Sequence, residues 1–228
     1  MIKYVFFDLD KTLFDFPTSE RLAISEVLVK FGISPTESTV KRYSEINRYC
    51  WDLLELGRIT KGELLEKRFV ILFSELCVNV SPSDAQAVYE NALGSHHPLI
   101  HGARELLSEL YGKYSIYAVT NGTAIVQDRR IRDSGLHKYF DGVFISERLG
   151  YAKPDVRFFE AAFANIKDFD KKLAIIVGDS LRSDILGGKN AGIRTCHYNP
   201  VGRANETDIM PDYEIKKLSE LPGLLKEL

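Results

Sequence analysis

Short apolar runs alternate with helical patterns along most of the chain, and this alternation limits the possible folds more than any other feature. Runs of strand length predict strands, and apolar residues at helical spacing predict the helices between them. Such an alternation is typical of βαβ units and a parallel sheet. The expected strands are Tyr4 to Leu9, Ser115 to Val119, Val143 to Ile145, Leu173 to Val177, Arg194 to Tyr198, and a weaker one near Tyr213 to Ile215.

The alternation stops between residues 17 and 97, where only helical spacing remains. Apolar stripes there include Leu22, Val27, Leu28 and Phe31; Val40, Tyr43, Ile46, Trp51 and Leu54; Leu64, Leu65, Phe69, Leu72 and Phe73; and Val88 with Leu93. We therefore expect a core domain of residues 1–16 and 98–228, with residues 17–97 inserted as a helical cap domain. A chain of 228 residues is long enough for this arrangement.

Composition and charge narrow the class of protein. The chain is 45% apolar and 27% charged, which is ordinary for a soluble globular protein. A net charge of −2 argues against a nucleic-acid surface, and no apolar run predicts a membrane span or a signal peptide. Three widely spaced cysteines (Cys50, Cys77 and Cys196) suit reduced thiols better than disulfides or a zinc site. We therefore expect a cytoplasmic protein without nucleic-acid or membrane partners. No feature predicts its oligomeric state.

Four polar clusters each follow a predicted strand. They are Asp8 with Asp10, Thr120-Asn121-Gly122, Lys153-Pro154-Asp155, and Gly178-Asp179-Ser180 with Asp184 behind it. Open α/β sheets bind ligands beyond the carboxyl ends of their strands, so we expect these clusters to meet there.

Each cluster taken singly has a simpler explanation. The aspartate pair could begin a loop or cap a helix, Asn121-Gly122 could form a turn, and Lys153 could be a solvated surface residue. Asp179 could cap the following helix, and Asp184 could be an exposed helical residue. However, Pro154 predicts a helix start, where the cation of Lys153 would oppose the helix dipole. Local conflicts of this kind cluster at functional sites.

Together the clusters fit phosphoryl transfer. Residues i and i+2 of a strand share a face, so Asp8 and Asp10 are expected to lie close and to repel unless a cation or proton intervenes. Asp8 can attack phosphorus as a carboxylate nucleophile, and Asp10 can serve as general acid and then general base. Such a site needs a metal because its carboxylates otherwise repel each other and the substrate.

The remaining polar residues complete this scheme. Mg²⁺ prefers hard oxygen ligands, so Asp8, Asp179 and one backbone carbonyl suffice to hold it. Lys153, Thr120 and the backbone after Asn121 would stabilise the phosphoryl oxygens. Asp184 would hold a metal-bound water or orient Lys153.

The four clusters resemble, in order and spacing, the motifs of the haloacid dehalogenase superfamily of phosphatases. The first motif is similar to Asp8-Leu9-Asp10-Lys11-Thr12, and the others to Thr120-Asn121, Lys153, and Gly178-Asp179 with Asp184. The resemblance implies a Rossmann-like, doubly wound sheet and a helical cap between the first two motifs. It also implies that Asp8, Asp179 and the main-chain oxygen of Asp10 bind Mg²⁺, while Thr120 and Lys153 hold phosphate. Lys11 departs from the family pattern, in which Gly is common.

A closer resemblance is to the bacterial pyrimidine nucleotide 5′-nucleotidases of this superfamily, which act on dUMP, dTMP and UMP. It rests on stretches such as Asn47-Arg48-Tyr49-Cys50-Trp51 in the cap and Ala152-Lys153-Pro154-Asp155-Val156 in the core. The substrate class implied is a small phosphate ester, a nucleoside monophosphate. Asn47, Trp51 and Arg68 are candidates to line a base pocket, although an aromatic at helical spacing such as Trp51 is more often helix core.

Other functions remain open at this point. Sugar-phosphate or phosphoglycolate phosphatases and phosphomutases would share the same motifs, and a dehalogenase would lack an acid at Asp10. A non-catalytic binding protein on this scaffold would be expected to lose the nucleophile or a metal ligand, whereas Asp8, Asp10 and Asp179 are all present.

Overall fold

The structure, a computed structural model, describes all 228 residues. Six parallel strands form one sheet in the order β3-β2-β1-β4-β5-β6. They are β1 (Tyr4–Phe7), β2 (Ser115–Thr120), β3 (Gly142–Ile145), β4 (Ala174–Gly178), β5 (Arg194–Tyr198) and β6 (Tyr213–Ile215). The strand order reverses at β1, which β2 and β4 flank on its two sides. Open α/β sheets bind ligands at such a reversal.

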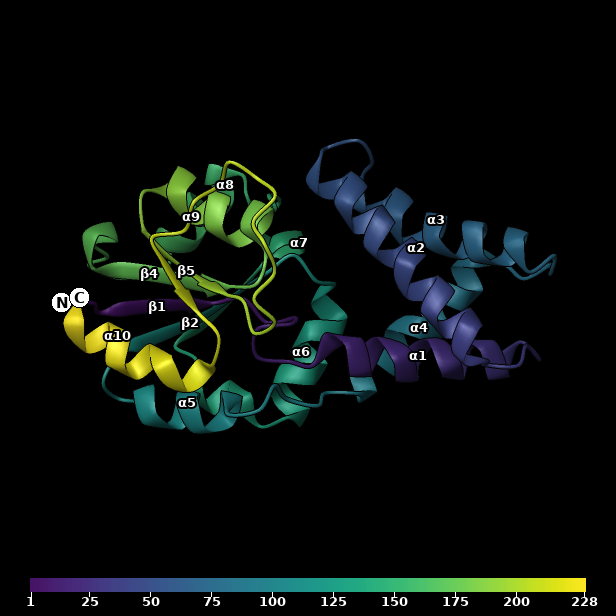
Figure 1. Ribbon diagram of the computed structural model, residues 1–228, viewed down its shortest axis with the longest axis horizontal. Coiled ribbons are helices and arrows are strands. Elements are labelled where there is room, and N and C mark those ends of the chain that lie inside the picture. The colour runs from purple at the N-terminus through teal and green to yellow at the C-terminus, as the bar shows by residue number, and fades with distance from the viewer. The chain divides into compact units, whose positions relative to one another are not determined.

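Helices cover both faces of the sheet (Figure 1). Successive side chains of β1 point to opposite faces, as the pleat of a strand requires. Val5 and Phe7 pack in one apolar cluster with residues of α5 (Ala103–Leu110) and α10 (Leu221–Glu227). Tyr4 and Phe6 pack in a second cluster with residues of α8 (Val156–Phe163). Because both faces are buried, this strand is continuously apolar, and its first polar residue follows its end.

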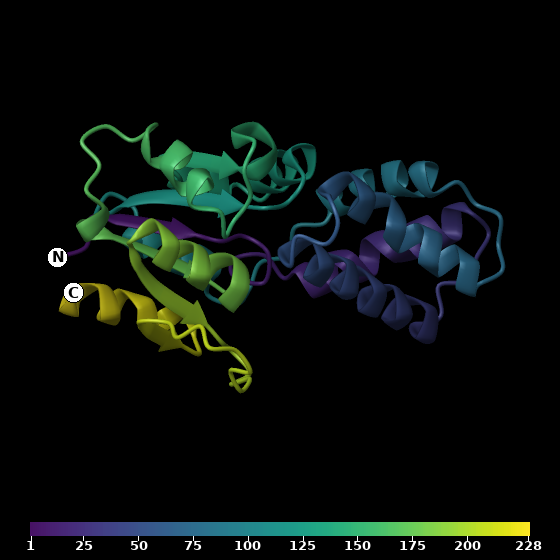
Figure 2. The ribbon, with the colours of Figure 1, turned by 90° about the horizontal axis from the view of Figure 1, so that it is seen from above.

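The other helices of this unit are short. They are α6 (Ala124–Asp133), α7 (Ser146–Leu149) and α9 (Leu186–Ala191), with single turns of 3₁₀-helix at Leu136–Tyr139, Lys171–Leu173 and Leu218–Glu220. A five-residue π-helix, Leu181–Ile185, leads into α9. The two termini lie near each other at one end of the sheet (Figures 1 and 2). None of the helices combines the length and the apolar character needed to cross a membrane.

Residues Phe16–His97 form a second compact unit, and Met1–Asp15 with Pro98–Leu228 form the first. The second unit consists of four helices: α1 (Phe16–Lys30), α2 (Glu37–Glu55), α3 (Lys61–Glu75) and α4 (Pro82–Ser95). Figure 2 shows these helices gathered in one bundle. The rings of Tyr43, Phe69 and Tyr89 pack at its centre with centroids 5.4–5.8 Å apart.

The predicted α/β fold with a parallel sheet and inserted helices is confirmed. Its first strand is wrong by two residues at its end, because the chain turns after Phe7 and the carbonyl of Leu9 accepts bonds from the amides of Leu13 and Phe14. The predicted cap began at residue 17, whereas Phe16 already begins α1. The predicted helix start at Pro154 is also wrong. The helix begins at Val156, and the Asp155 side chain caps it by accepting a bond from the Arg157 amide.

Candidate active site

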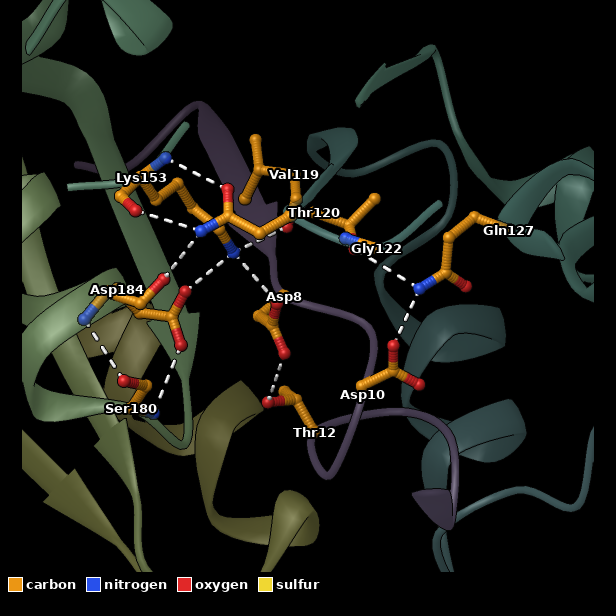
Figure 3. A network of polar contacts seen from close by, with 12 residues as sticks. Asp8, Asp10, Thr12, Val119, Thr120, Gly122, Gln127, Lys153, Ser180 and Asp184 are labelled. Carbon is orange, nitrogen blue, oxygen red and sulfur yellow. Dashed lines mark hydrogen bonds and ion pairs between the residues drawn. The ribbon is translucent and has the colours of Figure 1, made fainter. Parts of the chain in front are cut away.

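The ends of three strands and the segment after a fourth bring the predicted clusters together. Asp8 follows β1, Thr120 ends β2, and Gly178 ends β4 directly before Asp179. Lys153 comes from the segment between α7 and α8. Figure 3 shows Asp8, Lys153, Thr120 and Asp184 converging on one place. The geometry therefore agrees with the expectation that the polar clusters meet at the carboxyl ends of the strands.

Lys153 is the buried centre of this arrangement. Its Nζ lies 2.8 Å from Oδ1 of Asp8 and 2.7 Å from Oδ1 of Asp184, and it also donates to the carbonyl of Val119 at 2.7 Å. Burial lowers the pKa of this ammonium, but Asp184 and Asp8 outweigh burial and hold the pKa above its ordinary value. Lys153 is therefore a fixed positive charge, which excludes the surface role that a lone lysine suggests.

Three carboxylates surround this single cation. One oxygen from each of Asp8, Asp179 and Asp184 lies within 4.8 Å of the others. Burial raises the pKa of Asp8, and Asp184 and Asp179 raise it further against the effect of Lys153. Burial, with Asp184 and Asp10 adding to it, raises the pKa of Asp179 to about 7, while Lys11 and Lys153 oppose the shift. The cluster has more negative charge than Lys153 balances, and its hard oxygen donors suit Mg²⁺.

Local backbone structure holds Asp184 against the end of β4. The Ser180 amide donates to its Oδ2 at 3.1 Å, and the Ser183 amide donates to the Ser180 hydroxyl at 3.0 Å. A Cβ on Gly178 would fall 2.2 Å from Oδ2 of Asp184. Glycine at the end of the strand thus leaves the space that the carboxylate fills. The contact with Lys153 agrees with the prediction that Asp184 orients this lysine.

The side chains of Asn121 and Thr120 have different hydrogen-bond partners. The Asn121 side chain donates to the Lys153 carbonyl at 2.8 Å and accepts from the Lys153 amide at 2.9 Å. Asn121 therefore joins the segment of Lys153 to the end of β2. The sequence did not predict this structural role. Thr120 is buried, and its hydroxyl accepts bonds from the amide of Gly122 at 3.0 Å and from Gln127 at 3.2 Å. That Asn121 and Thr120 contact the phosphate stays a prediction.

Asp8 and Asp10 bind different partners. Because the strand ends before Asp8, the alternation that would put both carboxylates on one face does not extend to them. Asp8 turns toward Lys153 and Thr12, whereas Asp10 turns toward Gln127 of α6 (Figure 3). Arg130 of α6 also binds the Asp10 carboxyl. The carboxylates that crowd Asp8 are Asp179 and Asp184.

Four residues near the site were not predicted from sequence. Thr12 donates to Oδ2 of Asp8 at 3.2 Å, and Lys11 occupies the turn at φ 66°, which explains why glycine is common there in the family. Gln127 and Arg130 bind Asp10. A signal for the latter pair was present, since both lie on the buried face of α6 with Val126 and Ile131, where polar residues are unusual.

The three cap candidates lie within the helical unit. Asn47 and Arg68 are buried, with Nη1 of Arg68 donating to Oδ1 of Asn47 at 2.9 Å. Asn47 also donates to Glu20 at 2.6 Å, and Arg68 donates to Gln86 at 2.6 Å. Trp51, four residues after Asn47 on α2, is partly exposed rather than helix core. Contacts of these residues with a base stay a prediction.

Comparison with known proteins identifies the family. The profile of the haloacid dehalogenase-like hydrolases matches residues 2–192. The chain belongs to this family. It is 39% identical over 220 residues to the pyrimidine 5′-nucleotidase PynA of Streptococcus pneumoniae, covering 96% of this chain and 93% of that protein. It is 33% identical over 222 residues to the pyrimidine 5′-nucleotidase YjjG of Escherichia coli, covering 97% of each.

A crystal structure of the HAD-hydrolase YfnB from Bacillus subtilis, bound to magnesium, matches the fold with a TM-score of 0.95. It is 37% identical to this chain, and the match covers 98% of each. That magnesium-bound relative and the three clustered aspartates of this site confirm Mg²⁺ as the cofactor. The protein is therefore a phosphatase of this family with a site suited to Mg²⁺, and the family implies a small phosphate ester as its substrate.

Proposed function

We propose that the protein is a 5′-nucleotidase for pyrimidine nucleoside and deoxynucleoside monophosphates, acting through an aspartyl-phosphate on Asp8. The buried cluster of Asp8, Asp179, Asp184 and Lys153 is the observation that carries the chemistry. It combines a strand-end nucleophile, ligands for Mg²⁺ and a fixed cation. The two pyrimidine 5′-nucleotidases among the relatives support the choice of substrate.

The first half-reaction transfers the phosphoryl group to the enzyme. A carboxylate oxygen of Asp8 attacks phosphorus, the bond from phosphorus to the ester oxygen breaks, and the Asp10 carboxyl gives its proton to the leaving alkoxide. Lys153 and Thr120 stabilise the negative charge on the phosphoryl oxygens. Asp8, Asp179 and the main-chain oxygen of Asp10 would hold Mg²⁺, which would offset the charge of the carboxylates and of the ester.

The second half-reaction releases phosphate. Asp10, now a carboxylate, takes a proton from the water that attacks the aspartyl-phosphate. The bond from phosphorus to Asp8 breaks, the Asp8 carboxylate is restored, and Asp10 again carries a proton. Asp184 keeps Nζ of Lys153 beside the nucleophile throughout, through the 2.7 Å contact described above.

Selection of the base belongs, in this proposal, to the helical unit. Trp51 is the direct stacking contact, because its side chain is the partly exposed one of the three candidates. Asn47 and Arg68 take part by holding α2, which carries Trp51, and Asn47 lies one turn before it on the same face.

The first test measures Mg²⁺-dependent phosphate release from dUMP, dTMP, UMP, purine monophosphates and sugar phosphates, with Asp8→Asn as the control. Preference for pyrimidine monophosphates supports the proposal. Activity confined to sugar phosphates or phosphoglycolate keeps the mechanism and overturns the nucleotidase assignment. Inactivity of the wild-type protein on every ester would favour a binding protein on this scaffold.

A Trp51→Leu variant tests the base contact separately. We expect the preference for pyrimidine over purine monophosphates to fall, because stacking on the indole is lost. Turnover of p-nitrophenyl phosphate, which has no base, should change less. Equal losses on all substrates would assign Trp51 a structural role instead.

A further inference from the structure

Two side chains of α6 bind the carboxyl group of Asp10, one at each oxygen. Nη1 of Arg130 donates to Oδ1, and Nε2 of Gln127 donates to Oδ2 at 2.6 Å. The Asp10 side chain is 26% exposed, whereas that of Arg130 is fully buried. The carboxyl therefore reaches accessible space while the groups that hold it lie in the interior.

Arg130 is an unusual residue for a helix face that packs on the core. Its guanidinium lies over the ring of Phe14, 4.3 Å from the ring centroid. A guanidinium keeps its charge in a protein, and a buried charge is unfavourable without a partner. Asp10 is the carboxylate that pairs with it. The pairing ties the position of Asp10 to a helix whose Val126 and Ile131 are also buried.

Gln127 ties the same carboxyl to the end of β2. Its Nε2 lies 2.6 Å from Oδ2 of Asp10 and 3.2 Å from the hydroxyl of Thr120, so one amide bridges the two residues (Figure 3). Gly122 leaves room for this amide, since a Cβ there would fall 2.2 Å from Nε2. Thr120 is a proposed phosphate contact. The bridge therefore links the proposed acid to a proposed phosphate contact.

We propose that Gln127 and Arg130 are positioning residues that hold the Asp10 carboxyl where it exchanges its proton with the leaving group and the attacking water. This inference rests on the acid/base role proposed for Asp10. Neither side chain touches substrate in this scheme. Both act through Asp10, and they do so from a helix, which positions side chains more rigidly than a loop does.

The test compares two substrates that differ in how much they need an acid. Phenyl phosphate and p-nitrophenyl phosphate present similar rings, but phenoxide is the more basic leaving group and gains more from protonation. Single-turnover release of each phenol isolates the first half-reaction. We expect Gln127→Leu and Arg130→Met to slow phenyl phosphate at least about tenfold more than p-nitrophenyl phosphate, as loss of orientation does. Arg130→Lys, which keeps a cation, should recover part of the difference.

Two further variants control for structural damage. Arg129→Met makes the same chemical change on the neighbouring, partly exposed residue of α6, which pairs with Asp133, and should leave the ratio of the two rates unchanged. Gly122→Ala should reproduce the Gln127→Leu ratio, because its methyl group displaces the Gln127 amide. The ratio of rates within one variant is insensitive to the fraction of folded protein.

Asp10→Asn separates the two hypotheses. If Asp10→Asn leaves the ratio unchanged, the acid/base role of Asp10 is wrong. If Asp10→Asn shifts the ratio while Gln127→Leu, Arg130→Met and Gly122→Ala do not, the positioning role of α6 is overturned and the proposed function stands.

Discussion

The core unit and the helical unit each bury a cluster of charged side chains, but they balance charge in different ways. In the core, three carboxylates, Asp8, Asp179 and Asp184, cluster around the buried ammonium of Lys153, and Lys11 is the second lysine that acts on Asp179. In the helical unit, Asn47 links Glu20 to Arg68, accepting from the guanidinium and donating to the carboxylate. One cluster carries an excess of negative charge, and the other pairs one carboxylate with one guanidinium.

This difference in charge balance suits a catalytic role for the core cluster and a structural role for the cluster of the helical unit. In the balanced network, Ser44 and Gln86 supply further bonds to Glu20 and Arg68, and only Nε of Arg68 and Nε2 of Gln86 among its polar atoms are buried without a partner. An unbalanced cluster is unfavourable on its own, which shows here in the raised pKa values of Asp8 and Asp179, both caused mainly by burial. The core cluster therefore suits a cation and a phosphate ester, whereas the cluster of the helical unit pairs its charges within the fold.

The largest expected effect is that of Asp8→Asn, which removes the nucleophile from the unbalanced cluster. Turnover should fall by roughly 10⁴-fold or more, as for other nucleophiles. The melting temperature without metal should hold or rise, because one of three crowded carboxylates becomes neutral. Phosphate release and thermal melting measure the two effects. If the variant turns over substrate nearly as fast as the wild type, Asp8 is not the nucleophile.

Arg68→Met tests the balanced cluster. It leaves the Glu20 carboxylate buried without its counter-charge, so the unfolding free energy should fall by about 3–5 kcal/mol. Urea denaturation followed by the fluorescence of Trp51, the single tryptophan, reports on this unit directly. The double variant Glu20→Gln with Arg68→Met should recover part of the loss, since charge balance returns. A single variant as stable as the wild type would show that the pair is not coupled.

Lys153→Ala tests the buried ammonium of the core cluster. The barrier for turnover should rise by about 2–4 kcal/mol, as when a fixed donor to developing negative charge is lost. Lys189→Ala provides a matched change at a lysine whose side chain is 37% exposed. Steady-state rates at saturating Mg²⁺ measure both variants. An equally small loss of turnover in both variants would show that Lys153 has only a structural role.

The smallest effect concerns pH and metal. The pKa of Asp179 is about 7 in the fold, above its ordinary 3.8, so protonation stabilises the metal-free fold at low pH and this contribution is lost as pH rises toward 7. Mg²⁺ competes with that proton. The rise in melting temperature caused by Mg²⁺ should therefore be larger at pH 8 than at pH 6, by about a few degrees.

Asp179→Asn serves as the control for this measurement. It removes the titrating group and a metal ligand together, so the rise caused by Mg²⁺ should shrink at both pH values. A wild-type rise that is the same at pH 6 and pH 8 would contradict the assignment of Asp179 as the titrating ligand.

The sequence alone determined the parallel sheet, the helical insertion and the meeting of four polar clusters at the strand ends. These features follow from local patterns, because strand and helix periodicity and the polarity switch after a buried strand are visible within a few residues. Asp8, Lys153, Asp179 and Asp184 were all found in this way. The extent of the first strand was not, since the turn of Leu9 to Phe14 competes with strand pairing through its own hydrogen bonds.

Tertiary structure alone decided the direction in which each polar group points. Gln127 and Arg130, more than a hundred residues away in the sequence, bind the Asp10 carboxyl and turn it toward α6, and no local pattern around Asp10 predicts these partners. Asn121 reaches across the fold to the Lys153 backbone rather than toward open space. Such partners are chosen by the need to pair every buried charge and donor, and that need arises only once packing has excluded water.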